Sequence, residues 1–188
     1  MRLMVFIIAA IIAVALDTGF ASVFTLRGAW FITPSFVACL MTFTALLAPP
    51  STVLWCAWFL GILMDLSPGL GESAGSMHVI GPHALGYVLG AWIVLSFRTY
   101  MFRRRVLTVA LMTAVVVLAA GVTQIAIGIL RFWLPWAGGE LVPFGAGELL
   151  HEFGNAAYSM LLAIPVGWLL LQTIPIWRFD YGTSRRSG

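Results

Sequence analysis

The sequence predicts an all-α membrane protein, a six-transmembrane helical bundle with both termini in the cytoplasm (N-in/C-in). Composition is the first observation: of 188 residues, 61% are hydrophobic and only 9% are charged, and the mean hydropathy is +1.01. Soluble domains carry about 25% charged residues. A soluble fold of this size exposes too much surface to be covered by so few polar side chains. The expected surroundings are therefore the lipid bilayer, and no nucleic-acid partner is expected.

The second observation is the length of the apolar runs. They predict a single integral membrane domain over residues 1–188, with spans at about 3–26, 31–47, 50–65, 79–97, 106–130 and 147–174. A hydrocarbon core of about 30 Å requires roughly 20 residues per helix. The first run looks like a signal peptide but has no clean small-x-small cleavage site, so we expect a retained helix. Pro49 and Pro50 end the second run and begin the third, which predicts a tight helical hairpin.

The third observation is the placement of the ten basic residues, all of them arginine. A cytoplasmic N-terminus puts eight inside and leaves Arg27 and Arg131 outside. Because positive residues are retained in the cytoplasm, N-in/C-in is favoured. The basic loop of Arg98, Arg103, Arg104 and Arg105 has two interpretations: anchoring at the cytoplasmic interface, or binding of anionic lipid or a cytoplasmic partner. Trp177 is expected in an interfacial aromatic belt.

Asp65 ends the third run, where an unpaired carboxylate in the membrane costs on the order of 3 kcal/mol. Its position predicts that it faces protein or a wet cavity. Two interpretations remain: Asp65 marks a polar binding site lined by the glycine-rich loop that follows, or it accepts hydrogen bonds that fix the turn between two helices. Gly61 lies one turn earlier on the same helix face, so it allows a neighbouring helix to approach beside the carboxylate.

Two further patterns concern helix surfaces. Gly86 and Gly90 form a Gly-x-x-x-Gly pair, which indicates close helix packing, within the bundle or with another membrane protein. A polar stripe begins the sixth run and is either a wet groove or partner surface facing the fifth run, or the amphipathic start of a helix at the interface. Its residues are Glu148, His151, Glu152, Asn155 and Tyr158.

The remaining polar residues do not predict chemistry. His78 and His83 lack the i, i+4 spacing that places two ligands on one helical face, and His151-Glu152 lacks the second histidine of an H-E-x-x-H motif. We therefore predict no metal site and expect these histidines to make hydrogen bonds near the outer interface. No phosphate loop, nucleophile elbow or paired catalytic carboxylates are found, so neither enzymatic activity nor a cofactor is expected.

The elements follow one another in a definite order along the chain: a short first span, a second span introduced by Thr33-Pro34-Ser35-Phe36, a hairpin, Gly61-Ile62-Leu63-Met64-Asp65-Leu66, a glycine-rich loop and Leu85-Gly86-Tyr87. In this order and in these motifs the chain resembles the rod shape-determining protein MreD family. The resemblance marks Gly61, Asp65 and Leu66 as family motif residues. The chain departs from the family in the long loop after Asp65 and in the extended connection at 131–146, so contacts made by these regions are not carried over.

The resemblance implies a multi-pass protein of the bacterial inner membrane, with a fold similar to the substrate-binding subunits of energy-coupling-factor transporters. It also implies a non-catalytic scaffold of the cell-elongation machinery, acting in cell shape and peptidoglycan synthesis. The implied partners are MreC, MreB-type filaments, and the cell-wall glycosyltransferase and transpeptidase. The alternative is a small-molecule-binding transporter subunit with an outward-facing pocket around Asp65, Glu72 and Glu152.

Overall fold

The computed structural model of the chain describes residues 2–19, 23, 32–67, 81–100, 105–133 and 146–177, and these ranges form an all-helical fold. The helices are α1 (Leu3–Gly19), α3 (Phe36–Leu47), α4 (Pro50–Asp65), α5 (Pro82–Phe97), α6 (Val106–Trp133), α7 (Ala146–Gln172) and α8 (Ile174–Trp177). Within α6 and α7, the segments Val106–Leu130 and Leu149–Gln172 are long and apolar enough to cross a membrane. The other apolar helices are shorter, so six complete spans stay a prediction.

Local sequence signals explain where the helices begin. The predicted run at 31–47 becomes helical only at Phe36, because Ser35 is extended (φ −115°, ψ 114°) and its side chain caps the helix by accepting from the Ala38 amide. The run predicted at 79–97 begins its helix at Pro82, after Gly81 with φ +134°. A positive φ of this kind favours glycine. Pro50 begins α4 as predicted.

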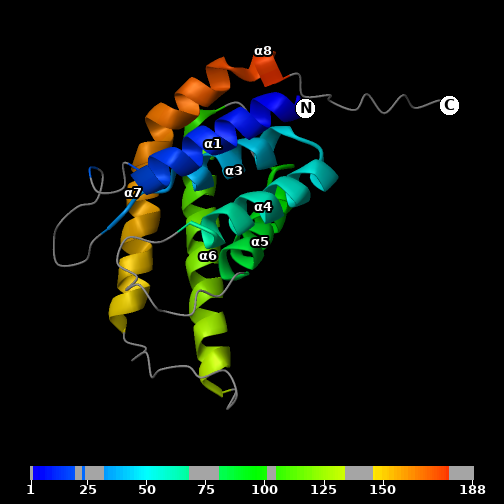
Figure 1. The fold of residues 1–188 in the computed structure, drawn as a ribbon. Helices are drawn as coiled ribbons and strands as arrows, with labels where there is room; N and C mark the ends of the chain where they lie inside the picture. The colour runs from blue at the N-terminus through cyan, green and yellow to red at the C-terminus, as the bar shows by residue number, and fades with distance from the viewer. Residues whose placement is uncertain are drawn as a thin grey trace.

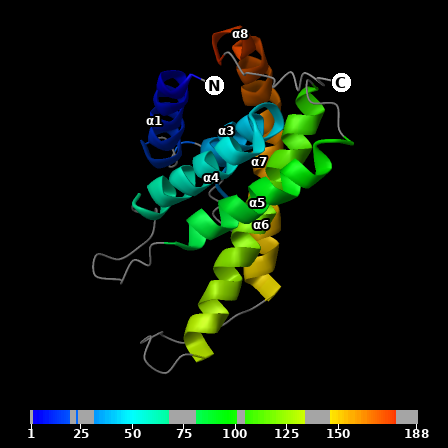
Figure 2. The same ribbon diagram turned by 90° about the vertical axis from the view of Figure 1, so that its right-hand side faces the viewer.

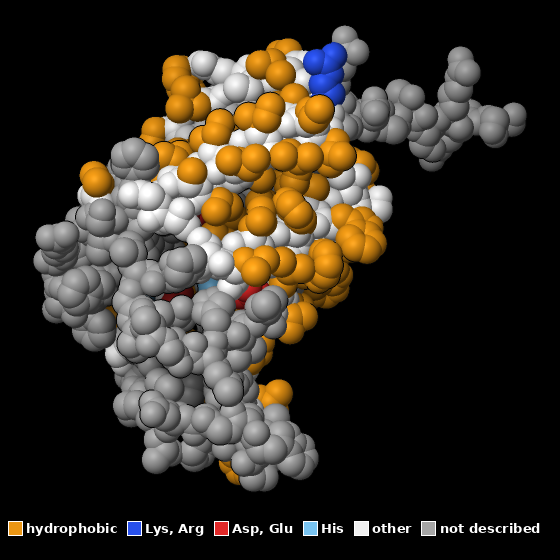
Figure 3. Space-filling view, in the orientation of Figure 1, with side chains coloured by type: hydrophobic (Ala, Val, Ile, Leu, Met, Phe, Trp, Pro, Cys, Tyr) orange, Lys and Arg blue, Asp and Glu red, His pale blue; other side chains and the backbone are white. Residues whose placement is uncertain are grey.

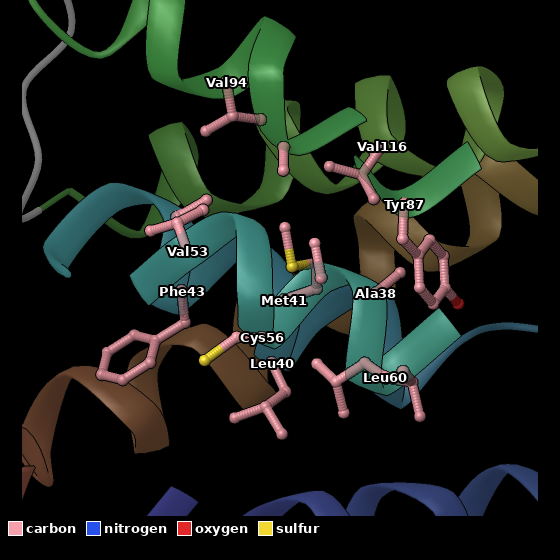
Figure 4. Packing of buried hydrophobic residues seen from close by; sticks show 14 of the residues in the cluster. Ala38, Leu40, Met41, Phe43, Val53, Cys56, Leu60, Tyr87, Val94 and Val116 are labelled. Atoms are coloured by element: carbon pink, nitrogen blue, oxygen red, sulfur yellow. The ribbon is translucent and has the colours of Figure 1, made fainter. Parts of the chain in front are cut away.

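α3 is the centre of the fold. All 12 of its residues are buried, and it contacts α1, α4, α5, α6 and α7. Figure 4 shows Ala38, Leu40, Met41 and Phe43 of α3 packed among side chains of the neighbouring helices. Since all sides of α3 meet protein, its sequence shows no amphipathic pattern. Its two polar residues, Thr42 and Thr44, are buried and donate their hydroxyl groups to carbonyls of the same helix.

Three glycines bring α5 close to the helices on either side. A Cβ atom at Gly61 of α4 would lie 2.6 Å from the Ala84 amide nitrogen, which belongs to the backbone of α5. At Gly86 it would lie 2.7 Å from the Ala120 Cα of α6, and at Gly90 it would lie 3.2 Å from the Val116 Cα. The Gly86 and Gly90 pair thus packs inside the bundle, against α6, which is the first of its two interpretations.

Trp177 differs from its predicted position at the membrane interface, since it is buried in the core. After Thr173 the chain turns into α8, which places the Trp177 ring edge-on to Phe43 of α3, with centroids 5.2 Å apart. The indole Nε1 donates to the Thr173 hydroxyl (2.9 Å), and the Trp177 carbonyl accepts from the Arg2 amide (3.1 Å). α8 therefore closes the bundle over one end of α3 and contacts the start of α1.

The two longest helices set the shape of the molecule. Figures 1 and 2 show α6 and α7 running side by side and extending past the shorter helices at the end away from α8. Exposed large hydrophobic side chains occur on α1, α4, α5, α6 and α7. On the face shown in Figure 3 they dominate the described surface. Soluble monomers rarely expose contiguous apolar surface on this scale, so this surface is consistent with membrane association.

The close approach at Gly61 generates a prediction. We expect Gly61→Ala to lower the free energy of unfolding by about 1–3 kcal/mol, because the new methyl group meets the backbone of Ala84 and His83, which cannot yield as a flexible side chain can. The protein is denatured with sodium dodecyl sulfate in mixed micelles, and the loss of helix is monitored by far-ultraviolet circular dichroism. Gly19→Ala is the matched control, because a Cβ there meets no atom within 4 Å; equal stability of the two variants would contradict the prediction.

Candidate functional site

The predicted site residue Asp65 caps the start of α5. It is 1% exposed, and its carboxylate accepts hydrogen bonds from the amides of Gly81 (2.8 Å), His83 (3.1 Å) and Ala84 (3.2 Å). The His83 ring contacts the same carboxylate through Nδ1 at 2.8 Å. The first amides of a helix have no partner within the helix, and its N-terminus carries partial positive charge, so an anion there is stabilising. This is the geometry of the turn-fixing interpretation, while ligand binding at Asp65 stays a hypothesis.

A second carboxylate, which the sequence analysis did not single out, does the same for α3. Asp17, near the end of α1, accepts from the amides of Phe36 (2.6 Å) and Val37 (3.0 Å) and from the Ser35 hydroxyl (3.0 Å). The Ser35 oxygen in turn accepts from Ala38. The signal available in the sequence was the same as for Asp65: a lone carboxylate near the end of an apolar run. Asp17 therefore joins α1 to the central helix.

α7 holds the segment before α3 from the other side. The Asn155 amide oxygen accepts from the Thr33 amide at 3.0 Å, and the Ser159 hydroxyl accepts from the Ser35 amide at 3.1 Å. Asn155 belongs to the predicted polar stripe, whereas Ser159, one turn further along and fully buried, was missed. The chain before α3 is thus fixed between α1 and α7 by polar contacts.

The structure brings part of the predicted stripe together. The Asn155 nitrogen Nδ2 lies 3.5 Å from His151 Nδ1. The same His151 nitrogen lies 3.8 Å from a Glu152 carboxylate oxygen. The Glu152 side chain also packs against Gly121 of α6, where a Cβ would collide with it. The side chain of Glu148 lies outside the described residues, and Tyr158 is partly buried. The stripe therefore contacts both α6 and the segment before α3.

Tyr87 connects the two capped helix starts. It is buried on α5, one turn after His83, and the two rings lie 6.4 Å apart, edge to face. Its hydroxyl group lies beside the Ser35 side chain. We call the connected residues the polar cluster; they are Asp17, Ser35, Asp65, His83, Tyr87, Asn155 and Ser159. Within the described part of the chain, every buried polar side-chain atom has a hydrogen-bond partner.

Arg98 of the predicted basic loop binds the opposite end of α3. Its Nη1 donates to the carbonyl of Ala48 (2.6 Å), the residue that follows α3, and to the carbonyl of Ala45 (3.5 Å) in the last turn of α3. Neither anchoring at the interface nor partner binding anticipated this role. Arg105 is exposed, and Arg103 and Arg104 lie outside the described residues. The basic loop therefore contributes at least one residue to the core.

The remaining residues of interest lie at a helix junction, at the surface, in the core or outside the described residues. Gly61 lies where α4 meets α5, and Leu66, the residue after α4, is exposed. Cys39 and Cys56 are free and buried. His78 and Glu72 lie outside the described residues. The described ranges hold no group of three or more His, Cys, Asp or Glu side chains arranged for a metal ion.

The hydrogen bonds of Asp17 generate a prediction that distinguishes their contribution to stability from that of hydrogen bonds within α1. Asp17→Ala leaves three donors without their acceptor, so we expect the unfolding free energy to fall by about 1–3 kcal/mol. The matched control is Thr18→Ala, because the exposed Thr18 hydroxyl bonds only within α1, to the Val14 carbonyl. Denaturation as above compares the two. If Thr18→Ala costs as much as Asp17→Ala, the capping contacts are not what holds α1.

Comparison with known proteins finds no relative of this chain. Neither a family model, nor a curated protein, nor a solved structure matches the chain. The resemblance to MreD therefore rests on the sequence pattern alone.

Proposed function

We propose that this protein is a non-catalytic scaffold of the bacterial cell-elongation machinery, of the MreD type. One observation carries the proposal: the carboxylate of Asp65, on which the family-like motif centres, is fully engaged in joining α4 to α5. Gly61, the other end of the motif, lies at the same junction, where the two backbones meet. A motif used for helix assembly suits a protein whose task is to present a fixed surface to partners.

We place this scaffold in the bacterial inner membrane as a multi-pass protein, N-in/C-in. Its apolar composition, the length of α6 and α7, and the exposed hydrophobic side chains of the other helices support this placement. The arginine distribution supports the orientation. In this orientation the polar cluster lies toward the outer side, and Arg98 lies at the cytoplasmic side.

The partners proposed are MreC, MreB-type filament proteins, and the glycosyltransferase and transpeptidase of cell-wall synthesis. A partner that crosses the membrane would meet the exposed apolar side chains of the helices. A cytoplasmic partner would meet the basic loop that contains Arg103, Arg104 and Arg105. A fold similar to the substrate-binding subunits of energy-coupling-factor transporters belongs to the same proposal.

The alternative function is a small-molecule-binding subunit of a membrane transporter. One observation favours it: the side chain of His83, which contacts the buried carboxylate of Asp65, is 33% exposed, so the His83 ring is reachable from outside the bundle. Ionisable groups within membrane segments often mark substrate paths. In this alternative, the amides of α5 and a ligand would compete for the same carboxylate.

The partners decide between the two functions. Photo-crosslinkers at exposed positions on α1 and α6, such as Ile8 and Leu111, would be activated in native membranes, and the captured proteins would be identified by mass spectrometry. Recovery of MreC and wider cells on depletion are expected for the scaffold. Recovery of an ATPase and a coupling subunit, with unchanged cell width, would replace it by the transporter function.

Asp65→Asn tests the structural role at the centre of the proposal. An amide accepts fewer hydrogen bonds than a carboxylate and removes the charge at the start of α5, so we expect unfolding free energy and partner recovery to fall together, the former by about 1–3 kcal/mol. Leu66→Ala, at the exposed neighbour, is the control. A variant with wild-type stability and wild-type partner recovery would exclude this role for Asp65.

A further inference from the structure

α4 and α5 form an antiparallel pair with a charged side chain at each end. At one end Arg98, directly after α5, bonds the Ala48 carbonyl just before α4. At the other end Asp65, the last residue of α4, caps the start of α5. Each helix has 16 residues, which correspond to about 24 Å. A hydrocarbon core is about 30 Å thick, so the pair is too short to cross an unperturbed bilayer.

On the side formed by α6 and α7 the helices are long enough to cross a bilayer. α6 has 28 residues and α7 has 27, which give each a length of about 40 Å. Figures 1 and 2 show both extending past α4 and α5 and show α4 and α5 running obliquely to α6. An oblique helix covers even less depth than its length. The two sides of the molecule therefore present apolar surface of different height.

Tryptophans mark a level within the short side. Trp55 and Trp92 are 70% and 62% exposed, and each lies five residues from the Arg98 end of its helix (55 − 50 and 97 − 92). Trp58 packs edge-on to Trp55 with ring centroids 6.0 Å apart. Indole rings concentrate at the membrane–water interface because they are apolar with one polar N–H group. From this level to Asp65 is about 15 Å of helix.

The surface beyond the tryptophans fits lipid headgroups. Arg98 lies at that end, and Arg2 and Arg105 directly precede α1 and α6. Positive side chains just outside a tryptophan level match the anionic headgroups of a cytoplasmic leaflet. Between that level and Asp65, the exposed residues of the pair include Phe59, Leu85 and Leu89, all apolar.

We propose that the exposed face of α4 and α5 binds a locally thinned phospholipid bilayer, with Trp55 and Trp92 at the headgroups of one leaflet and the Asp65 junction at those of the other. The membrane is thinner on this side than around α6 and α7. This inference rests on the membrane insertion contained in the proposed function and is independent of its partners.

The test measures depth at the middle of each side. Leu89 of α5 and Leu161 of α7 are exposed and lie near the middle of their helices. Each is replaced by cysteine in turn, in a chain carrying Cys39→Ala and Cys56→Ala, and a nitroxide is attached. The purified protein is reconstituted at low density in phosphatidylcholine and phosphatidylglycerol vesicles, and collision rates with oxygen and with a water-soluble nickel complex give the depth. Because Cys39 and Cys56 are buried, the otherwise native chain serves if the alanine background fails to fold.

Thinning predicts that the Leu161 label lies near the bilayer centre and that the Leu89 label lies about 10 Å shallower, within a turn of the Trp92 level. Equal depth for the two labels would overturn the thinned bilayer while leaving membrane insertion in place. A Leu89 label that neither reagent reaches would mean that protein, such as a second copy, covers this face, and would also overturn it. A Leu161 label accessible mainly to the nickel complex would show that membrane insertion itself is wrong.

Discussion

The fold depends on satisfying the two ends of a helix that has no access to solvent. α3 is buried along its whole length, so its first amides and last carbonyls must be paired by other parts of the protein. Asp17 and Ser35 accept from the first amides, and Arg98 donates to the carbonyl of Ala45 in the last turn of α3 and to that of Ala48, which follows it. The charges have the signs that a helix dipole favours, an anion at the N-terminus and a cation at the C-terminus. In an apolar bundle these contacts fix where α1 and α5 lie relative to α3.

The same arrangement occurs twice along the chain. Asp17 near the end of α1 caps the start of α3, and Asp65 at the end of α4 caps the start of α5. In each case a capped amide lies 19 residues after the carboxylate. A long connection between two helices leaves their relative position poorly determined, and a carboxylate that binds the next helix start removes this freedom without requiring a short loop. Tyr87 lies between the two caps, with its ring against His83 and its hydroxyl group beside Ser35.

A feature of this fold can be predicted from the sequence when the residues that determine it are close together in the chain. Asp65 was found because a carboxylate after an apolar run is costly wherever it lies, and Pro50 correctly placed the start of α4. Asp17 was passed over because the first run was extended to residue 26, which made it a residue within a span instead of one near a helix end. The site of Arg98 could not be predicted, since its partners are carbonyls 50 and 53 residues away. Trp177 depends in the same way on the turn into α8.

The division between helix ends and helix faces explains how one small chain can be both rigid and available to other molecules. Polar side chains are used at the ends, where backbone groups need partners, and glycines such as Gly61 and Gly86 are used where backbones must touch. α1 illustrates the result: Asp17 and the Arg2 amide hold its two ends, Phe6, Ala10 and Ala13 pack inward, and its exposed large side chains are apolar. Because the faces are not needed for polar contacts, a change in what covers them leaves the internal frame intact. This separation suits the proposed scaffold function, since the shape of a scaffold must not depend on which partner or lipid is present.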